Sequence, residues 1–230
     1  MATTLEIFFD RYTSETLWRW PTHADSPPPA VLSGHQVAHI LKPRINERSS
    51  QGHSSGGMTV STALLAPREL VNTNLEVPVI LKIAIGAEKI ELLRREAAVY
   101  ENCLPHLQGS VVPRCYGLYR GRAGARGQPT ENMACMILEY CTVHETPSMD
   151  RGEFAQRMKL AVWSLHQAGI IHGKLTDPRN VLDLGRKQGI RIVDFSAALR
   201  HECPSAGTNR YLGGGCQEVA IVDRQLASFH

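Results

Sequence analysis

Hydrophobic and polar residues alternate in several short stretches of the chain, and a period of two is typical of β-strands. Strands are predicted in two runs within residues 36–66 and at 77–84, 111–119 and 134–140. The second of the two early runs, 58–65, is rich in strand-forming residues, and a Ser/Gly-rich segment precedes it.

Two other segments repeat their apolar residues every three or four positions, which is the spacing of one helix face. The apolar positions are Ile90, Leu93, Ala97 and Tyr100 in segment 87–103, and Phe154, Met158, Ala161 and Leu165 in segment 151–168. A last helix is predicted over 216–228. Strands, a helix, more strands and a second helix, in this order, predict an α+β arrangement in two lobes.

Residues 1–35 differ from the rest of the chain in composition. They hold Phe8, Phe9, Tyr12, Trp18 and Trp20, and three consecutive prolines follow at 27–29. Prolines supply no amide donors and interrupt regular structure. We therefore interpret residues 1–35 as an aromatic segment and a Pro-rich linker, which either packs on the main body or docks a protein partner.

Charge and hydropathy exclude several classes of protein. Lys and Arg total 25 against 22 acidic residues, a net charge of +3, which is too small a surplus for a nucleic-acid surface. The apolar stretches are far shorter than the roughly 18–20 residues of a membrane span. No basic-then-apolar leader opens the chain. We expect an intracellular protein, cytoplasmic or nuclear, that binds neither nucleic acid nor membrane.

The six cysteines form no Cys-x-x-Cys pair, and we interpret them chiefly as small half-buried hydrophobic residues. A second interpretation joins His201, Cys203, Cys216 and His230 as zinc ligands, although their spacing is irregular.

Four polar residues stand out because of their surroundings. Lys82 lies in the middle of an apolar strand, and Glu96 follows fourteen residues later on a half-apolar stripe of the predicted helix. An unpaired buried carboxylate is costly, so Glu96 is expected to pair with Lys82. Asn180 and Asp194 are two oxygen ligands that suit magnesium.

Taken in order, these residues resemble the eukaryotic protein kinase family over roughly residues 37–200. The motifs that carry the resemblance are Val79-Ile-Leu-Lys82, Glu96, Leu138-Glu-Tyr-Cys141, His172-Gly-Lys-Leu-Thr-Asp-Pro-Arg-Asn180 and Asp194-Phe-Ser196. The resemblance implies a two-lobed fold with a β-rich N-lobe, residues 36–141, and a truncated helical C-lobe, residues 142–230.

The resemblance also implies ATP and Mg²⁺ as ligands. Gly52 and Gly57 would belong to a degenerate glycine-rich loop, and the backbone of Glu139 and Cys141 would bind adenine. The remaining implied roles are phosphate binding by Lys82 held by Glu96, magnesium binding by Asn180 and Asp194, and bracing of the catalytic loop by His172.

Three departures from the family pattern weaken the implied catalysis. Ser54 replaces the middle glycine of the loop, Lys174 replaces the catalytic aspartate, and no Ala-Pro-Glu-like motif follows Asp194. An ammonium group accepts no proton unless its pKa is strongly depressed. Asp177, three residues later, is the candidate replacement.

The sequence therefore favours an ATP-binding pseudokinase or weak phosphotransferase. Two alternatives stay open. One is an active small Ser/Thr-type kinase or small-molecule phosphotransferase that uses Asp177, and the other is an interaction module that binds no nucleotide.

Overall fold

The computed structural model describes residues 4–10, 13–22, 34–41, 58–67, 76–124, 130–141, 149–204 and 216–227. The chain divides into two compact units. Unit 1 consists of residues 1–97 and 115–140, and unit 2 consists of residues 98–114 and 141–230.

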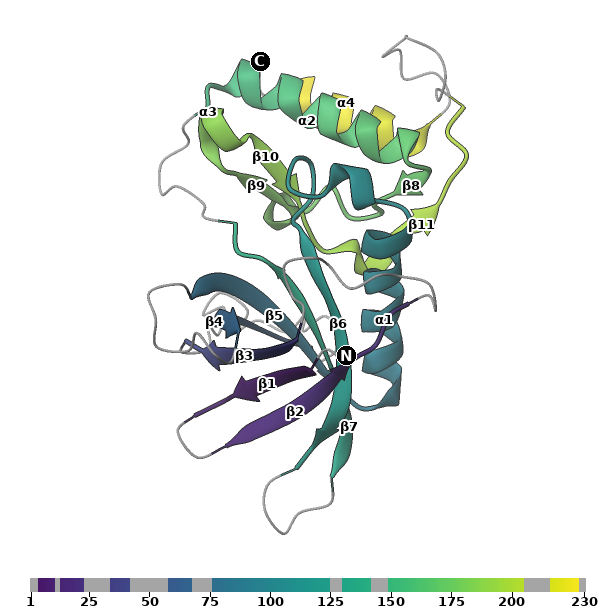
Figure 1. Cartoon of the computed structure of the whole chain (residues 1–230). Helices are drawn as coiled ribbons and strands as arrows, with labels where there is room; N and C mark the ends of the chain where they lie inside the picture. The colour runs from purple at the N-terminus through teal and green to yellow at the C-terminus, as the bar shows by residue number, and fades with distance from the viewer. Residues whose placement is uncertain are drawn as a thin grey trace, which may run out of the picture. The chain divides into compact units, whose positions relative to one another are not determined.

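The described residues of unit 1 form seven strands and the first part of a helix (Figure 1). The strands are β1 (Thr4–Phe8), β2 (Ser14–Arg19), β3 (His35–Ile40), β4 (Thr59–Pro67), β5 (Val77–Ile85), β6 (Cys115–Ala123) and β7 (Glu131–Glu139). The helix is α1 (Ala87–Asn102), which follows β5 after Gly86, a residue with a φ of 90° that glycine adopts without strain.

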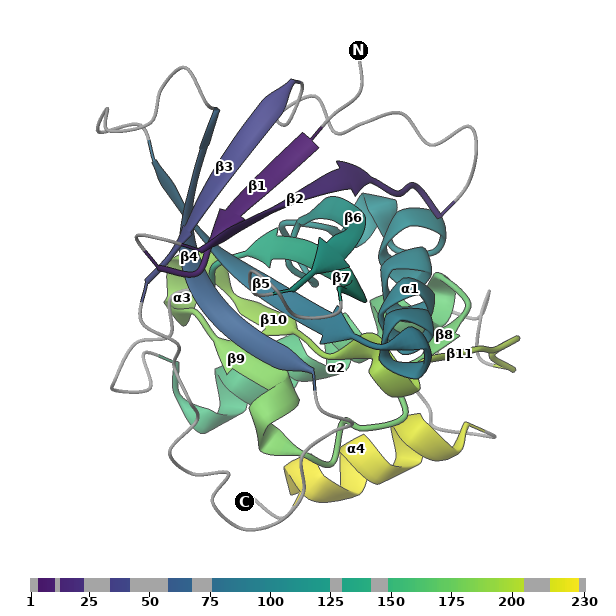
Figure 2. The ribbon, with the colours of Figure 1, turned by 90° about the horizontal axis from the view of Figure 1, so that it is seen from below.

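The seven strands close into a barrel in the order β1-β2-β6-β7-β5-β4-β3 (Figure 2). All neighbours are antiparallel except β1 and β3, which run parallel with Thr4 opposite His35 and Phe8 opposite His39. This parallel pair joins the first strand to the third and closes the sheet.

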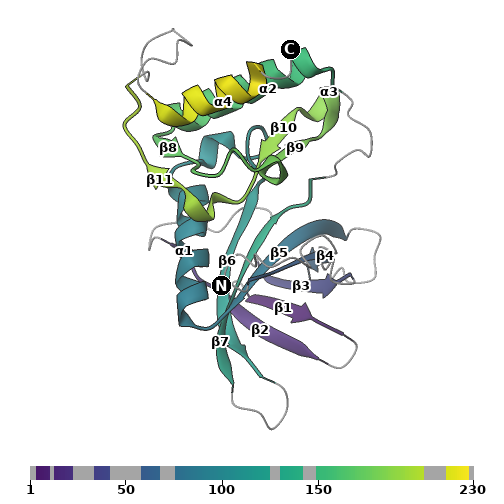
Figure 3. The ribbon, with the colours of Figure 1, turned by 180° about the vertical axis from the view of Figure 1, so that it is seen from behind.

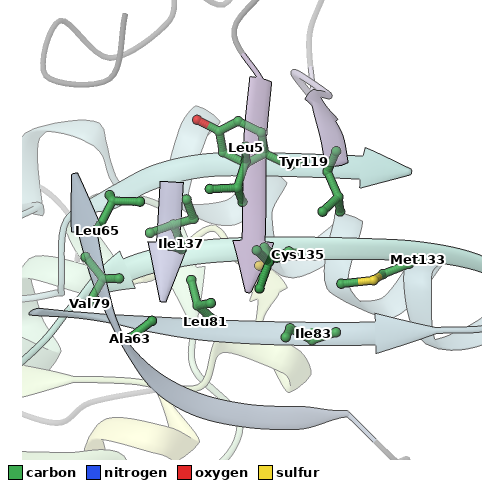
Figure 4. Packing of buried hydrophobic residues seen from close by; sticks show 13 residues of the cluster. Leu5, Ala63, Leu65, Val79, Leu81, Ile83, Tyr119, Met133, Cys135 and Ile137 are labelled. Carbon is green, nitrogen blue, oxygen red and sulfur yellow. The ribbon is translucent and has the colours of Figure 1, made fainter. Parts of the chain in front are cut away.

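Apolar side chains from every strand fill the barrel interior (Figure 4). Successive residues of a strand point to opposite faces, so every second residue contributes to this core. Its members are Leu5, Ile7, Leu17, Ala38, Ala63, Leu65, Val79, Leu81, Ile83, Tyr119, Met133, Cys135 and Ile137. Burial in this interior raises the pKa of Tyr119 to about 12 and raises that of the Cys135 thiol as well.

Unit 2 combines helices with short strands (Figure 3). Its α-helices, beyond the end of α1, are α2 (Arg151–Gln167), α3 (Gly185–Gln188) and α4 (Gln217–Ala227). Its strands form two two-stranded sheets, β9 (Val181–Asp183) with β10 (Ile190–Ile192), and β8 (Ile170–Ile171) with β11 (Leu199–Arg200). The described residues of unit 2 also contain three 3₁₀ turns: η3 (Pro105–Leu107), η4 (Pro178–Asn180) and η5 (Phe195–Ala197).

Helix α2 of unit 2 begins at a side-chain cap. Asp150 caps α2, because its side chain accepts a hydrogen bond from the amide of Glu153 at 2.8 Å. Helices α2 and α4 pack side by side (Figure 3), and Lys159 of α2 forms an ion pair with Asp223 of α4 at 3.2 Å. In the described part of the chain, no helix is long and apolar enough to cross a membrane.

The expected two-lobed kinase fold with a helical C-lobe is wrong. The strands of unit 1 form a closed seven-stranded barrel, and the described residues contain only four α-helices, one of them four residues long. The physical reason lies in the first 20 residues. Leu5, Ile7 and Leu17 are fully buried in the barrel, so this segment supplies two strands that complete the sheet instead of a separate segment ahead of a linker.

Because β1 closes the barrel, we expect its buried side chains to be essential to the stability of the folded protein. Leu5→Ala removes a fully buried side chain and should lower the free energy of unfolding by about 2–5 kcal/mol, measured by urea denaturation. Leu41→Ala is the matched control, since Leu41 follows β3 and is 43% exposed, and it should change stability far less. Equal effects of the two substitutions would contradict the closure of the barrel by β1.

Candidate functional site

The ion pair predicted between Lys82 and Glu96 is present in unit 1. Leu81 and Ile83 point into the barrel, so Lys82, between them on β5, points to the outer face of the strand. There its Nζ lies 2.6 Å from Oε2 of Glu96 on α1. The side chains of Lys82 and Glu96 are only 11% and 1% exposed.

Burial makes this ion pair different from a surface salt bridge. Leu93 and Ala97, which flank Glu96 on α1, are fully buried. Removing one member of such a pair leaves a charge in an apolar place and typically costs about 3–5 kcal/mol. The pair therefore fixes the position of the Lys82 ammonium group on the outer face of β5.

For the other residues implied to bind nucleotide, the structure gives the positions of Glu139 and Cys141 only. Glu139 is the last residue of β7 and lies opposite Val79 of β5. Cys141 follows as a half-buried cysteine. Gly52 and Gly57 lie outside the described residues.

His172 is a bracing residue in unit 2. Its side chain is fully buried, its Nε2 donates to the carbonyl of Val193 at 2.9 Å, and its Nδ1 accepts from the amide of Lys174 at 3.2 Å. Burial disfavours the charged ring and lowers the pKa of His172. Both ring nitrogens of the neutral ring are thus used to hold the loop that carries Lys174.

Asn180 and Asp194 lie on neighbouring segments of unit 2. Asn180 accepts a backbone hydrogen bond from Val193 at 2.9 Å, and its side-chain Nδ2 donates to the carbonyl of Lys174 at 3.0 Å. The amide oxygen of Asn180 is consequently the atom that could bind a metal ion. The structure brings this pair of sequence-predicted metal ligands into one region.

Asp194 has an unusual backbone conformation. With a φ of 66° and a ψ of 69°, it is the only non-glycine residue in the left-handed region within the described ranges. That region costs an ordinary L-residue about 1–2 kcal/mol, although aspartate tolerates it better than most. Strained residues of this kind cluster at binding and catalytic sites.

Three aromatic rings pack together at the residue after Asp194 in the chain: those of Phe195, His172 and Tyr100. Phe195, the next residue, is 1% exposed, and its ring lies 4.9 Å from that of His172 and 5.2 Å from that of Tyr100, both in edge-to-face geometry. The apolar periodicity of segment 87–103 predicted only that Tyr100 belongs to a helix face. Its contact with Phe195 gives that face a role in positioning Asp194.

Lys174 lies against the carboxylate of Asp194. Its Nζ is 3.6 Å from Oδ2 of Asp194 and donates to Oγ of Ser196 at 2.9 Å. The ammonium group therefore places one positive charge at the carboxylate that would otherwise attract a metal ion. As a cation it is also unable to accept a proton from a substrate hydroxyl.

Asp177, the candidate replacement base, is engaged elsewhere. It accepts a hydrogen bond from the amide of Arg179 at 3.0 Å and forms a two-pronged ion pair with the guanidinium group, with the shortest contact at 2.6 Å. The side-chain hydrogen bonds of Arg179 lower the pKa of Asp177. A carboxylate with a lowered pKa is a weaker proton acceptor.

Glu218 of α4, which was not among the predicted site residues, anchors this loop. Its carboxylate accepts hydrogen bonds from the amides of His172 at 3.1 Å and Gly173 at 2.7 Å. Burial alone would raise the pKa of Glu218, but the hydrogen bonds from His166 and from these amides outweigh burial and lower it. No local pattern connects Glu218 with residues more than forty positions earlier.

Comparison with known proteins gives no family for this arrangement. No protein-family model and no curated protein matches the chain.

Proposed function

We propose that this protein binds ATP together with Mg²⁺ and transfers the γ-phosphoryl group weakly or not at all. The proposal rests on the side chains described above and on the motif resemblance, and not on a kinase fold. Function depends on the chemistry of a site more than on the scaffold that carries it.

The observation that carries the proposal is that Asn180 and Asp194 lie on neighbouring segments of unit 2, where the backbone amide of Val193 donates to the carbonyl of Asn180 at 2.9 Å. An amide oxygen and a carboxylate are ligands that Mg²⁺ accepts, and magnesium in proteins is typically bound by one or two such groups together with substrate phosphates. The strained backbone of Asp194, held by buried Phe195, supports a role that needs a fixed carboxylate.

The ion pair of unit 1 supports a second part of the proposal. A lysine that is 11% exposed and held by a buried glutamate offers a positioned cation. Positioned cations are what binding of a triphosphate requires, since phosphoryl transfer depends on charge stabilisation more than on covalent chemistry.

Weak transfer follows from the groups that would have to accept the proton. Lys174 carries a positive charge beside Asp194, and Asp177 is bound by Arg179. Loss of a general base typically lowers a rate by about 10²–10⁴-fold. We therefore favour binding over turnover, and an active phosphotransferase and a nucleotide-free module remain as outcomes of the experiments below.

A thermal-shift titration tests the nucleotide. Mg²⁺ with ATP should raise the melting temperature of the native chain, because a ligand at 100 times its Kd stabilises the folded state by about 2.7 kcal/mol. Asp194→Asn should abolish the part of the shift that depends on Mg²⁺. Asp223→Asn, which alters a surface carboxylate paired with Lys159, should leave the shift intact. Absence of any shift in the native chain would favour the nucleotide-free module.

The ion pair of unit 1 allows stability and binding to be separated. Lys82→Met should lower the free energy of unfolding by about 3–5 kcal/mol, because it leaves Glu96 buried without this cation. The double variant Lys82→Met/Glu96→Leu should recover most of that loss in urea denaturation. It should nevertheless bind ATP more weakly than the native chain in calorimetry, and native-like affinity would contradict the phosphate-binding role of Lys82.

Restoring a carboxylate at position 174 tests the missing base. Lys174→Asp should raise ATP hydrolysis or autophosphorylation above the native level, by up to about 10²-fold, whereas Lys174→Asn should not, since it removes the ammonium group without supplying a proton acceptor. Asp177→Ala should leave native turnover unchanged. A loss of turnover in Asp177→Ala would instead support an active transferase that uses Asp177.

A further inference from the structure

A second group of metal-binding side chains lies in unit 2. His166 is near the end of α2, His201 and Cys203 follow β11, and Cys216 directly precedes α4. One candidate ligand atom from each residue lies within 4.8 Å of all the others. We propose that these four residues bind one structural zinc ion.

The distances within the group match the edges of a tetrahedral zinc site. Bonds of about 2.3 Å to sulfur and about 2.1 Å to nitrogen, at tetrahedral angles, separate a sulfur from a nitrogen ligand by about 3.6 Å. The Sγ atom of Cys216 lies 3.4 Å from Nδ1 of His166 and 3.6 Å from Nε2 of His201. A zinc ion therefore fits among these atoms with little rearrangement.

The chemistry of the donors selects zinc over magnesium. Two cysteine sulfurs and two imidazole nitrogens form one of the common ligand sets of closed structural zinc sites. Magnesium and calcium prefer oxygen ligands instead. Three of the four side chains are buried and His201 is partly exposed, which is typical of a site without an open coordination position.

Glu218 gives the group an outer shell. Its Oε2 lies 2.9 Å from Nε2 of His166, so this nitrogen carries the proton and Nδ1 is the atom that faces Cys216. A ligating histidine almost always donates its other N–H to a carboxylate or carbonyl, which fixes its tautomer and its ring orientation. The sequence suggested His201, Cys203 and Cys216 as ligands, and the structure adds His166, while His230 lies outside the described residues.

The zinc site would also brace the loop that carries Lys174. Glu218 accepts hydrogen bonds from the amides of His172 and Gly173 as well as from His166. A metal ion that fixes His166 and the start of α4 therefore also fixes Glu218 beneath this loop. The inference itself rests on the ligand geometry and is independent of the ATP proposal.

Cobalt substitution tests the site in the full chain. After removal of metal with a chelator under reducing conditions, Co²⁺ should bind one ion per chain and give intense tetrahedral ligand-field bands with thiolate-to-cobalt charge transfer. Added Zn²⁺ should displace Co²⁺ and erase the spectrum. Weak octahedral bands, or absence of the charge-transfer band, would overturn the proposal without any variant.

Ligand variants identify the residues that bind the metal. Cys216→Ser and Cys203→Ser should each lose the native cobalt spectrum, and Cys103→Ser, which alters a free cysteine outside the group, should keep it. Mass spectrometry of the chain as purified should show reduced Cys203 and Cys216 with one zinc ion retained. A disulfide between Cys203 and Cys216 that persists under reducing conditions would contradict the site.

Glu218→Gln tests the outer shell separately. It should lower Zn²⁺ affinity by about 10- to 100-fold in a chelator competition while leaving the cobalt spectrum tetrahedral. Glu202→Gln is the matched control, because this exposed carboxylate lies between His201 and Cys203 in the chain. Equal loss of affinity in the two variants would show that general charge, rather than the Glu218–His166 contact, tunes the site.

Discussion

The organisation of unit 2 depends on one carboxylate, that of Glu218, whose side chain is 10% exposed. Glu218 accepts hydrogen bonds from the ring of His166 and from the amides of His172 and Gly173. A buried carboxylate is tolerated only when such donors surround it. By collecting them, Glu218 ties the end of one helix, the start of another and the loop with Lys174 into one arrangement, and the position of Asp194 follows through His172 and Phe195.

In unit 1 the two faces of strand β5 have different roles. The inner face of β5 is apolar and fills the barrel, and the outer face holds the Lys82 ammonium group against Glu96. The pairing register of β5 with its neighbours is fixed, because a shift by one residue would place Lys82 in the core and Leu81 on the outer face. The packing of the barrel core therefore determines that the ammonium group of Lys82 lies on the outer face of β5.

The sequence predicted those features that repeat locally. Strand β5 and helices α1 and α2 lie where their periodicity placed them, and the Lys82–Glu96 contact followed from the cost of burying Glu96 alone. The strands β1 and β2 were missed, because Leu5 and Ile7 give only one cycle of alternation among aromatic residues. That short segment decided the fold, since it turns a sheet into a closed barrel. Glu218 and His166 were missed because their partners lie far away in the chain.

The parallel pairing of β1 with β3 has a consequence for the protein in solution. A closed barrel presents no unpaired strand, and unpaired strands are the usual templates for association between chains. Detachment of β1 would uncover the hydrogen-bonding groups of two strands at once, those of β2 and those of β3. Strand β1 thus protects the edges of β2 and β3 from pairing with other chains. Loss of β1 would therefore favour aggregation even where the remaining core stayed packed.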